Sequence, residues 1–197
     1  MHKIYFAFTI LVFASLLVGC AGDAVAQTND IAPTDTPEKP MPTDTATPEI
    51  IPHDPPASCP ITRAPDVPFV PPDPYPSKPP ARYVNQFWYG SSELWTMLGT
   101  DEIWSNLPHN RYGYTQKIFW WSQDFNREAE PYPAFTVTSE RLDVPSSPLV
   151  LSEEATNASA DFGTAILTGV AIPTLGCWKI TGKYKDAELS FVVWVAP

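Results

Sequence analysis

The chain is short of basic residues, histidine and cysteine, and each shortage excludes a class of function. It has 197 residues, with 12 Lys and Arg against 22 Asp and Glu, three His and three Cys. We expect no nucleic-acid partner, because phosphate binding needs clustered Lys and Arg. We also expect no metal centre and no cofactor, because the few His and Cys do not cluster as zinc ligands do.

Catalytic signals are equally scarce. His109 is the only histidine beyond residue 53, and no nucleophile motif surrounds it, so we interpret it as a solvated loop residue. Asp124, Glu128 and Glu130 could offer oxygens to calcium, but their spacing is not that of an EF-hand, and we interpret them as solvated charges. A glycosidase-type pair of carboxylates stays open, because separation in space cannot be read from a sequence. We expect no enzymatic activity, with a glycan-active enzyme as the weakest alternative.

A hydrophobic run long enough to span a membrane is missing as well. The run from Ile4 to Val18 has 15 residues, fewer than the ~20 that cross a bilayer, and it has the length of a secretory signal core. It ends in Leu17-Val18-Gly19-Cys20. This ending resembles the lipobox of bacterial lipoproteins, in which a small residue precedes the cysteine that becomes the lipidated N-terminus. The resemblance implies a cleaved signal peptide over residues 1–19 and a diacylglyceryl group, with acyl chains such as palmitate, on Cys20.

Ordinary signal cleavage is the competing prediction. Ala24-Val25-Ala26 is an A-x-A pattern, and cutting there would discard Cys20 and release a soluble protein. The pattern lies well past the hydrophobic run, so we favour lipidation. A single acyl chain holds a protein only marginally, at ~0.8 kcal/mol per buried methylene, whereas two or three chains anchor it stably. We therefore expect a lipid-anchored protein of the cell membrane, facing the periplasm or the cell exterior.

Two segments without regular structure are expected before the folded domain. Residues 20–57 contain no aromatic residue, and after Cys20 they carry one Lys against seven acidic residues. Such a composition cannot bury enough apolar surface to offset the entropy of ordering, which predicts a disordered acidic tether. Residues 58–82 remain rich in proline but include Phe69 and Tyr75. We predict an extended strap laid on the domain, the alternative being more linker.

Cys59 and Cys177 remain once Cys20 is assigned to lipid. An exported protein can form disulfides, and this pair allows a single bridge. Cys177 falls on the polar face of its strand, with Lys179 and Thr181, so the bridge should clamp the strap to the outer side or edge of the domain. The alternative is two free thiols.

Residues 83–197 predict an all-β domain. Apolar alternation predicts a hairpin between Gly176 and Val195, with its turn at Asp186-Ala187, and no long amphipathic helix is visible. Several short strands separated by Pro and Gly favour an immunoglobulin-like β-sandwich. The other strands are expected at residues 83–90, 116–122, 135–142, 149–152 and 165–172, the last with a bulge at Gly169. Residues 93–98 could form a further strand or one helical turn.

The strap after Cys59 and the aromatic runs carry a wider resemblance. Phe-Trp-Tyr-Gly, Phe-Trp-Trp and the ending Gly-Cys-Trp…Ser-Phe-Val-Val-Trp-Val resemble a group of bacterial lipoproteins without an assigned activity. The similarity covers roughly residues 58–197. It implies an immunoglobulin-like fold, and a fold alone does not define a function.

Trp88, Tyr89, Trp120 and Trp121 are the candidate binding residues. Neighbours on a strand face opposite ways, so one residue of each adjacent pair should leave the core. An exposed Trp face can stack on a sugar or anchor a partner protein; the competing expectation, which we favour, is that the strap covers that face. Two functions follow: a binding or interaction module for a protein or glycan of the envelope, or a structural accessory domain without a ligand.

Overall fold

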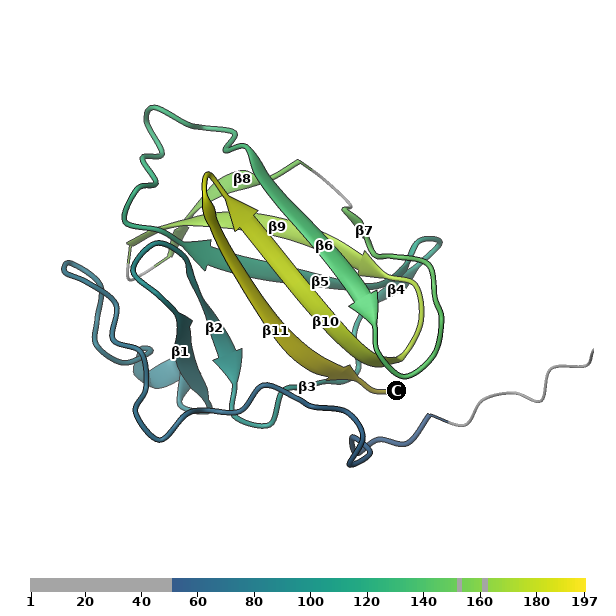
Figure 1. Cartoon of the computed structure of the whole chain (residues 1–197). Coiled ribbons are helices and arrows are strands. Elements are labelled where there is room, and N and C mark those ends of the chain that lie inside the picture. The colour runs from purple at the N-terminus through teal and green to yellow at the C-terminus, as the bar shows by residue number, and fades with distance from the viewer. Residues whose placement is uncertain (1–50, 152–153, 161–162) are drawn as a thin grey trace, which may run out of the picture. The chain divides into compact units, whose positions relative to one another are not determined.

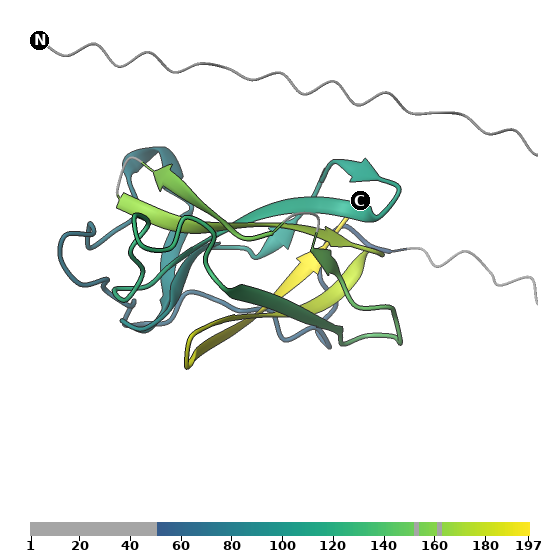
Figure 2. The ribbon, with the colours of Figure 1, turned by 90° about the horizontal axis from the view of Figure 1, so that it is seen from above.

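The computed structural model describes residues 51–151, 154–160 and 163–197. This part of the chain forms two β-sheets that face each other, so the predicted all-β class is confirmed (Figure 1; Figure 2). The predicted signal peptide, Cys20 and the tether up to residue 50 lie outside the described residues. Within the described ranges, no helix is long and apolar enough to cross a membrane.

The larger sheet has seven strands and the smaller sheet has four. The larger sheet follows the order β1 (Gln86–Gly90), β2 (Trp95–Gly99), β5 (Gly113–Trp121), β9 (Gly163–Ile172) and β7 (Val150–Leu151), with β4 (His109–Asn110) beside β5 and β8 (Thr156–Ala160) beside β9. The smaller sheet follows the order β3 (Ile103–Trp104), β11 (Ala187–Val195), β10 (Gly176–Tyr184) and β6 (Phe135–Arg141). The chain crosses between the sheets after β2, β3, β5, β6 and β9.

The longer strands lie where the apolar patterns predict them, but two local predictions are wrong. The strand expected from Tyr83 begins only at Gln86, because the 3-10 helix Ala81–Tyr83 precedes it. The bulge expected at Gly169 is absent: β5 and β9 pair without a break, and Gly169 lies opposite Lys117. The short strands β3, β4 and β8 have no predicted counterpart.

The C-terminal hairpin of β10 and β11 is confirmed. Tyr184 pairs with Ala187, so the turn consists of Lys185 and Asp186, one residue earlier than predicted. Lys185 adopts the left-handed conformation with φ of 52°, which lets the strands reverse over a short loop. The alternating apolar side chains of both strands, such as Ile180 and Phe191, enter the main core between the sheets.

That core is built around Trp120 of the larger sheet. Its indole is fully buried and packs against Phe135 and Phe191 of the smaller sheet, with ring centroids 5.0 and 5.7 Å away. Its Nε1–H donates to the hydroxyl of Thr168 at 3.0 Å. The indole of Trp120 is therefore packed against apolar rings, and its one polar atom has a hydrogen-bond partner.

The proline-rich segment before β1 packs on both sheets. Near Cys59, the backbone N–H of Thr62 donates to the carbonyl of Val192 at 2.9 Å, and the N–H of Val192 donates to the Thr62 hydroxyl at 2.8 Å. Further along, Trp88 Nε1–H donates to the carbonyl of Pro76 at 3.0 Å. We call residues 58–82 the strap. Proline has no N–H donor, so hydrogen bonds to the strap use its carbonyl groups, such as that of Pro76, and the few residues that are not proline, such as Thr62.

Packing on the domain begins before the strap. Trp194 Nε1–H donates to the carbonyls of Pro52 and His53, each at 3.1 Å, and Ile51 packs beside Trp194 and Cys177. The side chain of His53 is exposed. Residues 51–57, expected to belong to the tether, therefore lie on the folded domain, because an indole that needs an acceptor holds their carbonyl groups.

Candidate functional site

The tryptophans proposed for binding are buried. Trp88, Trp120 and Trp121 are at most 1% exposed. Each adjacent pair does divide between the two faces of its strand: Trp120 and Tyr89 pack with the main core, whereas Trp121 and Trp88 lie on the outer face of the larger sheet. These three indoles are therefore not available to stack on a sugar, and Tyr89 is half-buried against the core.

The strap covers the outer tryptophans, which is the alternative that we favoured from the sequence. Phe69 and Tyr75 pack on Trp95, with ring centroids 5.9 and 5.1 Å away. Tyr75 also fits over Gly163, where an added Cβ would lie 2.6 Å from the tyrosine ring. Trp88 meets Trp121 edge-on at 5.1 Å. The cluster is a second, smaller core, with the strap as its outer layer.

Cys59 and Cys177 form the predicted disulfide, with their Cα atoms 5.7 Å apart. The bridge lies on the outer side of the smaller sheet, where Cys177 pairs with Trp194. Both cysteines are buried, with Trp194 and Ala196, in a small apolar patch at one end of that face. The strap is thus fixed covalently close to its start.

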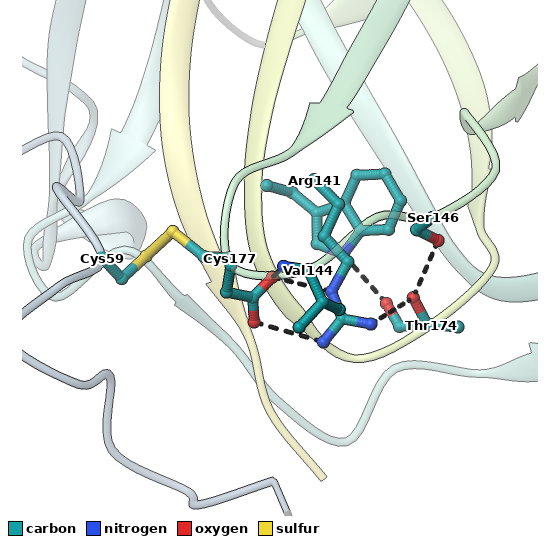
Figure 3. Close-up of polar contacts among 8 residues, drawn as sticks. Cys59, Arg141, Val144, Ser146, Thr174 and Cys177 are labelled. Atoms are coloured by element: carbon teal, nitrogen blue, oxygen red, sulfur yellow. Dashed lines mark hydrogen bonds and ion pairs between the residues drawn. A yellow bond between two sulfur atoms is a disulfide. The ribbon is translucent and has the colours of Figure 1, made fainter. Parts of the chain in front are cut away.

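A polar cluster beside the disulfide joins the loop after β6 to the turn before β10 (Figure 3). Arg141 Nε donates to Asp143 at 2.7 Å, and its Nη1 donates to the Thr174 hydroxyl at 3.1 Å. Burial on its own would raise the pKa of Asp143, but hydrogen bonds from Arg141 and the N–H of Cys177 bring it below the ordinary value. Gly176, with φ of 131°, leaves room for the guanidinium, because a Cβ would lie 2.7 Å from it. We interpret this cluster as structural.

An open hollow lies on the uncovered half of the larger sheet's outer face. Its volume is about 390 Å³, and it is lined by Pro108, Thr115, Gln116, Lys117, Glu154, Thr156, Leu167 and Gly169. Thr115 is held in place by hydrogen bonds from its N–H and its hydroxyl to the carbonyl of Pro108, at 2.7 and 3.0 Å. Gly169 has no side chain, so the backbone of β9 forms the floor of the hollow at this position. A positive and a negative group, Lys117 and Glu154, are both exposed at its rim.

Sequence reasoning missed this hollow. The one available signal was Gly169, because a glycine inside a strand often marks a place where another group approaches the backbone. We interpreted it as a bulge instead. The remaining lining residues come from four separate segments, and only the register of β5, β8 and β9 brings them together.

The other sequence candidates have ordinary surroundings. Glu130 accepts a hydrogen bond from the Tyr184 hydroxyl at 2.9 Å and lies 3.2 Å from Lys185 Nζ. His109 is exposed as expected, but it lies in β4 with its ring 4.6 Å from that of Tyr114, so the loop assignment is wrong. No group of three or more His, Cys, Asp and Glu within the described ranges is placed to hold a metal ion.

Glu102, between β2 and β3, was not singled out by the sequence. It is 1% exposed, and its backbone carbonyl accepts the N–H of Trp194 at 2.9 Å. Neither carboxyl oxygen has a hydrogen-bond partner among the described residues. Burial, followed by the negative charge of Asp101, raises the pKa of Glu102 to about 9.

Comparisons of the chain with protein families, curated proteins and solved structures find no match.

Proposed function

We propose that the chain is a lipid-anchored envelope protein that carries an immunoglobulin-like β-sandwich as a binding module on an acidic tether. The lipobox ending at Cys20 supports the anchor. Two facing sheets, with a chain that crosses between them repeatedly, support the immunoglobulin-like architecture. The acidic, aromatic-free tether would hold the domain away from anionic lipid.

The hollow on the larger sheet is the observation that carries the binding role. Its volume of about 390 Å³ is within the usual range of ligand sites. Thr115 and Thr156 bring hydroxyl groups to its lining, and Leu167 adds apolar surface. Lys117 offers donors and Glu154 offers acceptors. This combination suits a hydroxyl-rich ligand, and we assign the site to a glycan of the cell envelope.

A structural accessory role is the second candidate. The burial of Trp88, Trp120 and Trp121 favours it, because the largest aromatic groups stabilise the domain and present no face to a ligand. In this case the hollow would have no occupant.

A binding assay with matched lysine variants separates the two roles. Soluble peptidoglycan fragments and a glycan array are offered to the purified full chain, to Lys117→Ala and to Lys183→Ala. Lys183 is also exposed, but it lies on the smaller sheet. We expect the wild type and Lys183→Ala to bind at least one glycan, and Lys117→Ala to lose about tenfold or more in affinity, equivalent to ~1.4 kcal/mol.

Two outcomes would reject the binding role. One is that no peptidoglycan fragment or glycan binds the wild type. The other is that Lys117→Ala binds as tightly as Lys183→Ala. Either result leaves the structural role as the better description, provided that both variants melt like the wild type.

A further inference from the structure

Side-chain oxygens gather over the bare face of Gly99, the last residue of β2. A Cβ placed on Gly99 would lie 3.3 Å from Asp101 Oδ1 and 3.5 Å from Glu102 Oε1. Both carboxyl groups therefore point to the same space, which no side chain of Gly99 fills. Gln86 pairs with Gly99 across the β1–β2 ladder, so its side chain leaves the sheet on this same face.

Glu102 shows that this space lacks a partner group. Its residue is 1% exposed, and both carboxyl oxygens are buried without a hydrogen-bond partner among the described residues. Gln86 Oε1 is buried and has no hydrogen-bond partner there either. Buried carboxylate and amide oxygens are seldom left without a donor or an ion, because removing them from water is costly.

We infer that Asp101, Glu102 and Gln86 form a calcium site over Gly99. All of these donors are oxygens, the ligand type of hard cations, and calcium tolerates an irregular arrangement that includes water. Asp101 is exposed, so waters can complete the coordination from its side. Magnesium suits the space less well, because it demands near-ideal octahedral geometry at ~2.1 Å.

The position of the site gives calcium a structural consequence. Gly99 ends β2 in the larger sheet, and the carbonyl of Glu102 accepts the N–H of Trp194 in the smaller sheet. A bound ion would tie together the crossing from β2 to β3. Calcium binding should therefore raise the melting temperature of the whole domain.

Gly99→Ala is the most direct test. A methyl group would occupy the space between the oxygens, yet contacts of 3.3 and 3.5 Å are tolerable, so the variant should fold. Glu102→Gln keeps the size of the side chain, but its amide cannot lose a proton to a bound cation as the buried carboxyl group can. Asp66→Asn is the matched control, because Asp66 is an exposed acidic residue of the strap.

The melting temperature of the full chain is measured in EDTA and in about 10 mM CaCl₂ or MgCl₂. Extracellular calcium modules have Kd values of ~10⁻⁴–10⁻³ M, so calcium should raise the wild-type midpoint by roughly 3–8 °C. Asp66→Asn should respond equally, while Gly99→Ala and Glu102→Gln should melt cooperatively in EDTA and not respond.

Terbium adds a spectroscopic measurement: its luminescence, sensitised by nearby tryptophan, should appear with the wild type and not with Gly99→Ala. The calcium site would be overturned by any of these results: no calcium response in the wild type, an equal response in Gly99→Ala, loss of the response in Asp66→Asn, or an equal response to magnesium.

Discussion

Gly182 of β10 lies against the indole of Trp120 on the opposite sheet. A Cβ on Gly182 would stand 2.6 Å from two carbons of that ring. The two sheets approach this closely because one strand lacks a side chain where the other carries the largest one.

Gly182→Ala should therefore destabilise the domain. The added methyl group overlaps Trp120 and Phe135, and overpacking of this kind costs about 1–3 kcal/mol in free energy of unfolding. Urea denaturation followed by tryptophan fluorescence measures the loss. Gly99→Ala in EDTA is the control, because its methyl group meets no atom closer than 3.3 Å. Equal stabilities of the two variants would contradict this packing.

Reduction of the Cys59–Cys177 bridge should lower the melting temperature. The two residues are 118 positions apart, and removing a disulfide from a domain of this size typically costs about 2–4 kcal/mol. Cys59→Ala and Cys177→Ala should each cause this loss, and the double variant should lose no more. Mass spectrometry after alkylation without reductant should find neither cysteine modified; modification of both would show that the bridge does not form.

Tyr75→Ala should expose the tryptophans beneath the strap. The ring of Tyr75 packs on Trp95 and over Gly163, and its removal should cost about 1–3 kcal/mol in stability. Acrylamide quenching of tryptophan fluorescence should increase. Tyr132→Ala removes a tyrosine that is 73% exposed and should change neither property. Unchanged quenching in Tyr75→Ala would indicate that the strap does not cover the cluster.

Asp143 should contribute stability that is lost in acid. Its pKa in the folded protein is lowered by hydrogen bonds from Arg141 and the Cys177 N–H, against the opposing effect of burial. The contribution is present above the unfolded value of 3.8 and declines as the pH falls through the folded value. Asp143→Asn should lose roughly 1–3 kcal/mol at pH 7 and differ less from the wild type at pH 3. Urea titrations at both pH values, with Asp66→Asn as control, measure this; a constant difference would refute the ion-pair explanation.

The hairpin, the disulfide and the cover over the outer tryptophans could be predicted from the sequence, because each depends on residues that are close together in the chain or few in number. The hairpin of β10 and β11 follows from alternating apolar residues, and the bridge follows from having Cys59 and Cys177 as the only cysteines outside the lipobox. The cover over Trp88 and Trp121 was inferred correctly because a proline-rich segment with Phe69 and Tyr75 can pack on aromatic rings.

The features that sequence reasoning missed depend on long-range register. The hollow needs β5, β8 and β9 in their observed alignment before Lys117 and Gly169 face the same space. In the sequence, nothing distinguishes Glu102 from an exposed acidic residue. In the structure it lies directly before β3, which pairs with β11, and it is buried. The packing of Pro52 and His53 on the domain depends on Trp194, more than a hundred residues away, whose indole N–H donates to their carbonyl groups.

The intact mass of the mature N-terminus tests the proposed envelope anchor most directly. The full chain is expressed in a bacterial host, separated into membrane and soluble fractions, and analysed by mass spectrometry. We expect it in the membrane fraction, beginning at Cys20 and carrying two or three acyl chains, whereas Cys20→Ser should stay unprocessed or leave the membrane. A soluble, unmodified chain that begins at Gln27, directly after Ala24-Val25-Ala26, would contradict the lipid anchor.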